Sequence, residues 1–284
     1  MASMPHLSQL QRDYRDQNVT IIGLTSEDQN NSLEQVKQMV DDKGDGMDFT
    51  VAWDVERKTN EAYMKASNQR GIPTSFLVDQ AGKIAWIGHP MSVDIPMAMV
   101  LDKTWDYEKG PALLKRINEQ KQAIYEAAGS DPEQALELLT TFREAYPLAA
   151  GGLETLHFSI LTQLPGREAE ATKVGREIVQ REIAAKNAGA LNAFAWNLVD
   201  PQVNSANRYL DLALLAAVKA NEFTGGEDAA ILDTVARVYF WRGDLEKAVE
   251  HQKRAVKYAE GRMKEALLPA LEEYEKAIRE KQPS

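Results

Sequence analysis

The chain has 284 residues, of which 44% are hydrophobic and 27% charged, and its formal net charge at pH 7 is −10. This length favours two domains with separate cores, and the composition is typical of a folded globular protein. The acidic balance argues against nucleic acid as a partner, because binding to phosphates requires clustered Lys and Arg side chains.

Neither a membrane span nor an export signal is predicted. The longest apolar run, Leu212 to Val218, is much shorter than the ~20 residues that cross a bilayer as a helix. The N-terminal residues do not read as a signal peptide, because Arg12 and Asp13 lie where an apolar stretch is required.

The first third of the chain alternates short β-rich runs with helical patterns. The β-branched run from Val19 to Leu24 predicts a buried strand. Ser32 and Gln35 have the spacing of a capping box and predict the start of a helix. Phe49 to Trp53 alternates as a second strand does, and Glu56 to Ala66 returns to a helical pattern.

A β-hairpin and a closing helix follow. Thr74 to Val78 and Lys83 to Ile87 are apolar runs, and the turn-rich segment Asp79-Gln80-Ala81-Gly82 joins them. Met97 to Leu101 predicts the closing helix. The order of elements is typical of an α/β fold.

The remainder of the chain is helical almost without interruption. A charged segment that ends in the break Gly110-Pro111 places the domain boundary near Tyr107, so we predict domains at residues 1–107 and 108–284. Ser130-Asp131-Pro132 predicts the start of a helix that ends at Tyr146-Pro147. Its apolar face consists of Ala135, Leu138, Leu139 and Phe142.

The segment from Ile231 to Ala255 reads as two helices, with a turn at Gly243 and a cap at Asp244. Its tyrosine, glycine and two alanines resemble the consensus of tetratricopeptide (TPR) repeats. It departs from that consensus at Leu232, where tryptophan is usual, and at Gln252, where an aromatic residue is common.

The spacing of alanines supports the same interpretation. Ala213 and Ala220 precede Ala248 and Ala255 by 35 residues, which is close to the ~34-residue period of these repeats. The resemblance implies a TPR-like array of helical hairpins with degenerate repeats. It also implies a protein or peptide partner bound through the helical repeats.

A second resemblance covers residues 1 to about 105. Met4-Pro5-His6-Leu7, the strand at Val19, the run from Gly71 to Asp79, and Gly82-Lys83-Ile84 together resemble a TlpA-type thioredoxin-like domain of the redoxin, AhpC/TSA-related group. In that family a W-C-x-x-C motif opens the first helix, and a proline lies five residues beyond the second cysteine. Pro5 matches this proline, so the second cysteine would stand just before Met1.

The chain has no cysteine, and we therefore assign no catalytic residue. The family strand that leads into the motif would also be missing, between the strands at Val19 and Thr74. Unpaired backbone groups on buried strand edges cost ~1–3 kcal/mol each, so we expect an incomplete thioredoxin-like fold. The sequence leaves open whether Met1 is an internal start, a genuine start or the edge of a fragmentary reading frame.

One functional segment of the family has a full match: Gly71, Ile72, Pro73 and Thr74. The resemblance implies that the peptide bond before Pro73 is cis, and that the backbone of the preceding residue pairs with an extended peptide substrate. We predict no metal and no cofactor, because His6, His89, His157 and His251 lie far apart without a ligand spacing.

Two functions follow from these observations. The chain is a redox-inactive scaffold or protein-interaction module of the thiol-disulfide oxidoreductase family, or it is a fragment of an active oxidoreductase whose cysteine pair lies upstream of Met1. Localisation cannot be read from the chain, although the resemblance implies an extracytoplasmic or periplasmic setting for a full-length parent.

Overall fold

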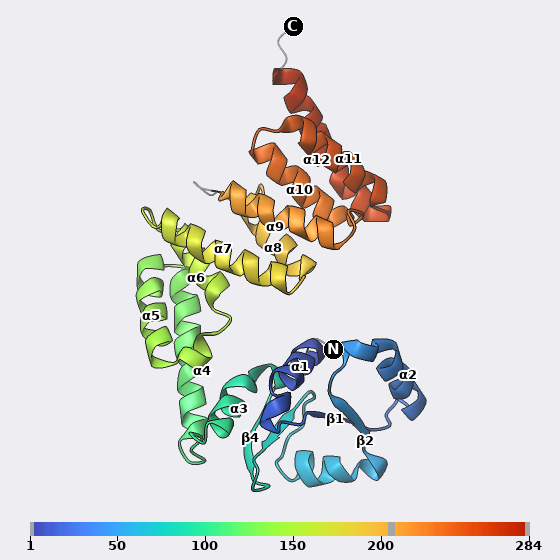
Figure 1. Ribbon diagram of the computed structural model, residues 1–284, viewed down its shortest axis with the longest axis vertical. Helices are drawn as coiled ribbons and strands as arrows, with labels where there is room; N and C mark the ends of the chain where they lie inside the picture. The colour runs from blue at the N-terminus through green and yellow to red at the C-terminus, as the bar shows by residue number, and fades with distance from the viewer. Residues whose placement is uncertain (1–2, 204–207, 282–284) are drawn as a thin grey trace. The chain divides into compact units, whose positions relative to one another are not determined.

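The computed structural model describes residues 3–203 and 208–281. The chain divides into two compact units, Met1–Glu119 and Gln120–Ser284 (Figure 1). This division falls within helix α4 (Gly110–Ala128), whereas the sequence pattern places the boundary near Tyr107, before that helix begins. The boundary at Tyr107 therefore stays a prediction.

The first unit contains short strands and helices in alternation, as the sequence predicts. In chain order they are α1 (Ser3–Asp13), β1 (Ile22–Thr25), α2 (Leu33–Lys43), β2 (Thr50–Trp53), β3 (Ser75–Val78), β4 (Ile84–Gly88) and α3 (Asp94–Leu101). Single 3-10 turns lie at Arg15–Gln17, Gly44–Gly46 and Pro90–Ser92. The predicted capping box at Ser32 is confirmed, because Ser32 and Gln35 bond each other's backbone N–H groups.

The strands form two separate two-stranded sheets. β1 and β2 are parallel, with Ile22 opposite Thr50, and α2 makes the crossover that a parallel pair requires. β3 and β4 are antiparallel, with Ser75 opposite Gly88, so the predicted hairpin is confirmed. β1 and β3 are not paired with each other, and no strand of the described residues joins the two sheets.

β1 is not the buried strand that the sequence predicts. The side chains of Ile22 and Leu24 are 55% and 52% exposed. Strands rich in Ile, Leu and Val are buried when other elements cover both of their faces and edges. Ile22 and Leu24 lie two residues apart and so share one face of β1, and in the described part of the chain that face is left largely uncovered.

A small apolar cluster links both sheets to α1 and α3. Leu10 of α1 and Met97 of α3 are buried in it, together with Val93. Leu77 of β3 and Ile21, which directly precedes β1, pack against these residues. The two sheets of the first unit therefore border one core.

The segment from Glu56 to Ala66 is helical, but it is not the regular helix that the sequence predicts. Val55–Arg57 forms a 3-10 turn, and Asn60–Lys65 forms a π-helix. Glu56 and Arg57 both have φ of +57°, which breaks the helical geometry at its start. The apolar spacing cannot reveal such a break, because it depends on backbone angles at two polar residues.

The second unit is predominantly helical, and helices adjacent in sequence pack side by side (Figure 1). After α4 come α5 (Pro132–Ala145), α6 (Glu154–Thr162), α7 (Glu168–Ala184), α8 (Ala188–Val199), α9 (Leu210–Phe223), α10 (Ala229–Trp241), α11 (Leu245–Tyr258) and α12 (Gly261–Lys281). A 3-10 turn lies at Pro147–Ala150. In the described part of the chain, every helix is too short or too polar to cross a membrane.

α5 begins and ends where the sequence predicts. The Asp131 carboxylate accepts a hydrogen bond from the backbone N–H of Gln134 at 3.0 Å, and Pro132 occupies the first turn. Ala135, Leu139 and Phe142 are buried. Leu138 is 36% exposed, so the predicted apolar face is wrong at this residue.

Small side chains allow α9, α10 and α11 to pack closely. Ala213, Ala220, Ala248 and Ala255 are all fully buried. Gly243 turns the chain between α10 and α11 with φ of +79°, a conformation that favours glycine.

Asp244 stands at the N-terminal boundary of α11, but it is not the side-chain cap that the sequence predicts. Its side chain makes no capping hydrogen bond. A carboxylate oxygen lies instead 2.9 Å from Nζ of Lys247, three residues along the helix.

Candidate functional site

Gly71, Ile72, Pro73 and Thr74, the predicted peptide-binding residues, form a loop directly before β3. The Ile72–Pro73 peptide bond is cis, as the family resemblance implies. The side chain of Ile72 is 86% exposed, more than any other large hydrophobic side chain of the described residues. Oγ1 of Thr74 donates a hydrogen bond to the carbonyl oxygen of Gly71 at 2.6 Å, which closes the loop on itself.

β3 continues this loop as a strand with one open edge. Among the strands of the described residues it is hydrogen-bonded to β4 only. Phe76 packs edge-on against Tyr63, with 5.2 Å between the ring centroids, and Leu77 packs against the cluster that contains Leu10. These contacts anchor the strand, while its second edge faces no other strand of the described residues. An anchored strand with a free edge can accept an extended peptide by strand addition.

β1 has a second open edge. Its partner β2 lies along one edge. Backbone groups of alternate residues point to opposite edges, so those of Ile22 and Leu24 point away from β2. Ile21 and Leu77 pack against the same buried residues, so the open edges of β1 and β3 border a common core. Two-stranded sheets of this length are marginally stable alone, and an added strand would stabilise both.

Nothing in the described part of α1 takes the place of a thiolate. The position expected for the second cysteine precedes Met1, which lies outside the described residues. α1 begins at Ser3, and its nearby histidine is engaged elsewhere: Nε2 of His6 lies 3.1 Å from Oδ2 of Asp94 in α3. A hydroxyl nucleophile would need a base beside it, and within the described residues the hydrogen-bond partner of His6 is Asp94 rather than a hydroxyl group.

Asp54 is a buried carboxylate that the sequence interpretation overlooked. Its two oxygens accept hydrogen bonds from the backbone N–H groups of Thr59 and Asn60, both at 2.8 Å. Burial raises the pKa of Asp54. The two backbone donors, and then the charge of Arg57, lower the pKa by a larger amount, so the net shift is downward. The side chain is held as a carboxylate and caps the segment after β2. The position of Asp54 between a predicted strand and a helical pattern is the sequence signal that could have predicted this capping role.

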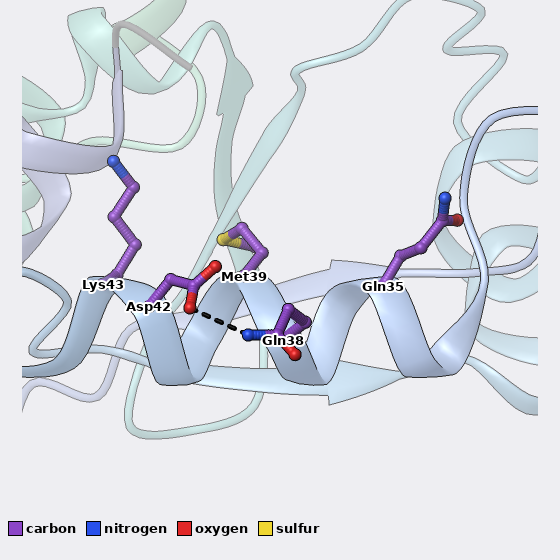
Figure 2. A pocket seen from close by; sticks show the side chains of 5 residues that line it. All are labelled: Gln35, Gln38, Met39, Asp42 and Lys43. Carbon is purple, nitrogen blue, oxygen red and sulfur yellow. Dashed lines mark hydrogen bonds between the residues drawn. The ribbon is translucent and has the colours of Figure 1, made fainter.

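A surface hollow of about 440 Å³ lies along α2 (Figure 2). All of its lining residues come from this one helix: Gln35, Gln38, Met39, Asp42 and Lys43. Figure 2 shows Gln38 donating a hydrogen bond to Asp42, at 2.9 Å. Because no second element forms an opposite wall, we assign no ligand to this hollow.

The histidines lie on different elements, and each has its own neighbour. His89 accepts a hydrogen bond from the N–H of Met91, His157 is bonded to Arg143, and His251 contacts the carbonyl oxygen of Lys247. Within residues 3–203 and 208–281, no group of three or more potential ligands could hold a metal ion. The expected absence of a metal stays a prediction.

Comparison with known proteins bears on the first unit only. Residues 1–87 match the AhpC/TSA family. This N-terminal region is a redoxin-family domain. The match covers α1, β1, β2, β3 and the loop at residues 71–74, and it ends within β4. It does not distinguish a TlpA-type domain from other redoxin-family domains. No curated protein and no solved structure matches the chain significantly.

Proposed function

We propose that this protein binds extended polypeptides through its redoxin-family domain and does not itself catalyse thiol-disulfide exchange. The observation that carries the proposal is the loop at residues 71–74, where the exposed side chain of Ile72 leads into the open edge of β3. Main-chain hydrogen bonds along such an edge supply affinity, and a neighbouring apolar side chain adds contact area.

The lack of catalysis follows from the chemistry of the exchange. A thiolate must attack a disulfide sulfur, and the chain contains no cysteine. We expect the purified chain to reduce insulin or a small disulfide at the background rate. Activity that survives removal of external thiols would contradict this part of the proposal.

Peptide binding can be tested with a labelled, S-alkylated insulin B chain as an unstructured probe. Ile72→Asp places a charge at the start of the open edge and should weaken binding about tenfold or more. Leu148→Asp is the matched control, because Leu148 is also an exposed apolar residue, at 58%, but lies in the second unit. Equal losses in both variants, measured by fluorescence anisotropy, would show that the loop has no special role.

The helical unit fits a TPR-like array that holds a protein or peptide partner. The buried alanines at a 35-residue offset support this interpretation, because they permit close helix packing in two successive hairpins. Leu232 and Gln252, which depart from the repeat consensus, are also fully buried and so act as packing residues.

A second candidate is the substrate-binding part of an active oxidoreductase whose W-C-x-x-C segment lies upstream of Met1. The open edges of β1 and β3 on a common core favour it, because one added strand would pair with both. Such a parent would use a low-pKa thiolate at a helix N-terminus, and we place it outside the cytoplasm by family resemblance.

The upstream coding DNA separates the two candidates. An in-frame strand followed by W-C-x-x-C supports the oxidoreductase, whereas a stop codon directly upstream supports the cysteine-free binder. Adding a strand and a W-C-x-x-C helix start to the chain should also raise the free energy of unfolding by several kcal/mol, roughly 1 kcal/mol for each restored hydrogen bond. Thermal midpoints that are equal with and without the extension, and independent of protein concentration, would show that the sheet needs no added strand.

A further inference from the structure

The last helix, α12, is held to α10 and α11 by a cluster of polar side chains, which we call the polar cluster: Asp233, Arg237, Gln252, Glu273 and Tyr274. The amide nitrogen of Gln252 donates to Oδ1 of Asp233 at 2.8 Å and to the carbonyl oxygen of Leu267 at 3.1 Å. Nη1 of Arg237 donates to Oε2 of Glu273 at 2.8 Å. One side chain of α11 thus ties α10 to α12, and a second polar bond joins α10 directly to α12.

The hydrogen bonds of the polar cluster are incomplete. Six buried side-chain atoms of the described residues have no hydrogen-bond partner, and three of them belong here: Nε of Arg237, Oε1 of Gln252 and the hydroxyl of Tyr274. Burial raises the pKa of both Asp233 and Tyr274, as expected where water is excluded. Because buried polar groups without partners are costly, this interface is weaker than an apolar one of equal size.

The apolar part of the same interface is small. Among the described residues of α12 only Leu267 and Tyr274 are buried, and each packs in a separate cluster with residues of α10 and α11. The Tyr274 ring stacks on Phe240, with 4.6 Å between the centroids. Pro269 lies inside α12 and removes one backbone hydrogen bond from the helix.

We infer that α12 is a releasable cover, which undocks as a unit from α10 and α11 while the rest of the helical unit stays folded. Undocking lets water reach the three unpaired atoms. Their hydration offsets part of the free energy that is lost with the apolar contacts. Undocking also exposes the residues that α12 covers, Ala236, Arg237, Ala248 and Gln252. This role is independent of peptide binding at residues 71–74.

Hydrogen-deuterium exchange of the full chain tests the inference. The amides from Ala266 to Ile278 should share one opening constant, larger than that of α10 by about tenfold or more. Ordinary fraying predicts something else: protection that increases residue by residue inward from Lys281, without a common constant. Such a gradient, or exchange of α12 only together with α10, would overturn the inference.

Two matched pairs of variants should shift this constant in opposite directions. Tyr274→Phe removes the unpaired hydroxyl and keeps the ring, so α12 should open about tenfold less often. The control is Tyr239→Phe, which removes a hydroxyl from a partly buried ring of α10 and should leave the opening constant of α12 unchanged. Glu273→Gln weakens the bond to Arg237 and should increase opening severalfold, whereas Glu272→Gln, at the exposed neighbouring residue, should not. No slowing in Tyr274→Phe would contradict the inference, even if α12 opens readily.

Discussion

The two units of this protein obtain their stability by different means. In the helical unit the core is dense: all of the largest fully buried side chains of the described residues lie there, among them Phe142, Leu191 and Leu232. In the redoxin-family unit the sheet is divided, and Ile22 and Leu24 of β1 are about half exposed. The interior of a helix satisfies its own backbone hydrogen bonds, so a helical unit depends mainly on side-chain packing and on caps at the helix ends. A strand depends on its neighbours, and each absent neighbour leaves backbone and side chains unpaired.

The largest effect is expected from cutting the chain at the predicted boundary. Residues 108–284 contain all of α4 to α12 and should unfold cooperatively with a strong helical circular dichroism signal. Residues 1–107 should show a weaker transition at lower temperature, because their two-stranded sheets share only a small core with α1 and α3. A fragment of residues 120–284 begins inside α4 and should be less stable than 108–284. A random-coil spectrum for 108–284 would contradict the proposed organisation.

Leucine truncations should separate the two units next. Leu232 is fully buried in α10, and Leu232→Ala should lower the free energy of unfolding by about 2–5 kcal/mol. Leu24 is 52% exposed in β1, and Leu24→Ala should cost less than about 1 kcal/mol. Urea unfolding followed by circular dichroism measures both. Similar costs at the two positions would show that β1 is buried in solution.

Helix caps should give a smaller difference. Asp131 accepts a hydrogen bond from the N–H of Gln134, so Asp131→Ala should destabilise the helical unit by about 1 kcal/mol. Asp244 makes no such bond, and its carboxylate contacts Lys247 at the surface, so Asp244→Ala should change stability by less than about 0.5 kcal/mol. If Asp244→Ala costs as much as Asp131→Ala, then Asp244 caps α11 in solution.

The smallest effect concerns pH and the buried His157 of α6. Burial, and then the charge of Arg143, lower the pKa of His157 below its ordinary value of 6.5. The unfolded chain therefore binds a proton more readily than the folded one. Stability should be complete above pH 6.5 and should fall as the pH is lowered from there. His157→Gln should flatten this slope in thermal melts between pH 7 and pH 5, and an unchanged slope would exclude His157 as its source.

Local sequence signals predicted much of both units. The capping box of Ser32 and Gln35, the hairpin turn at Asp79 to Gly82 and the cap at Asp131 depend on residues only a few positions apart. The cis bond before Pro73 came from the family resemblance. For the capping box, the hairpin and the cap the deciding contact lies within a short segment, so the sequence pattern contains it.

The predictions that failed depend on partners that the local pattern does not contain. The apolar run at Val19 predicted a buried strand, but burial of Ile22 and Leu24 requires an element packed over their face of β1, and the described residues leave that face largely uncovered. Asp244 stands where a cap belongs, yet Lys247 holds its carboxylate. The polar cluster under α12 was also missed, because Asp233, Gln252 and Tyr274 are far apart in sequence and meet only after three helices pack.

The open edge of β1 should also affect how the protein behaves in concentrated solution. The run Val19-Thr20-Ile21-Ile22-Gly23-Leu24-Thr25 has no charge and no proline, and it is rich in β-branched residues, which is the composition of segments that stack into cross-β fibrils. The net charge of −10 keeps molecules apart at low ionic strength, and added salt screens that repulsion. Aggregation should therefore begin in the redoxin-family unit and become faster with salt, and a lysine in place of Ile22 should delay it while the helical unit remains folded.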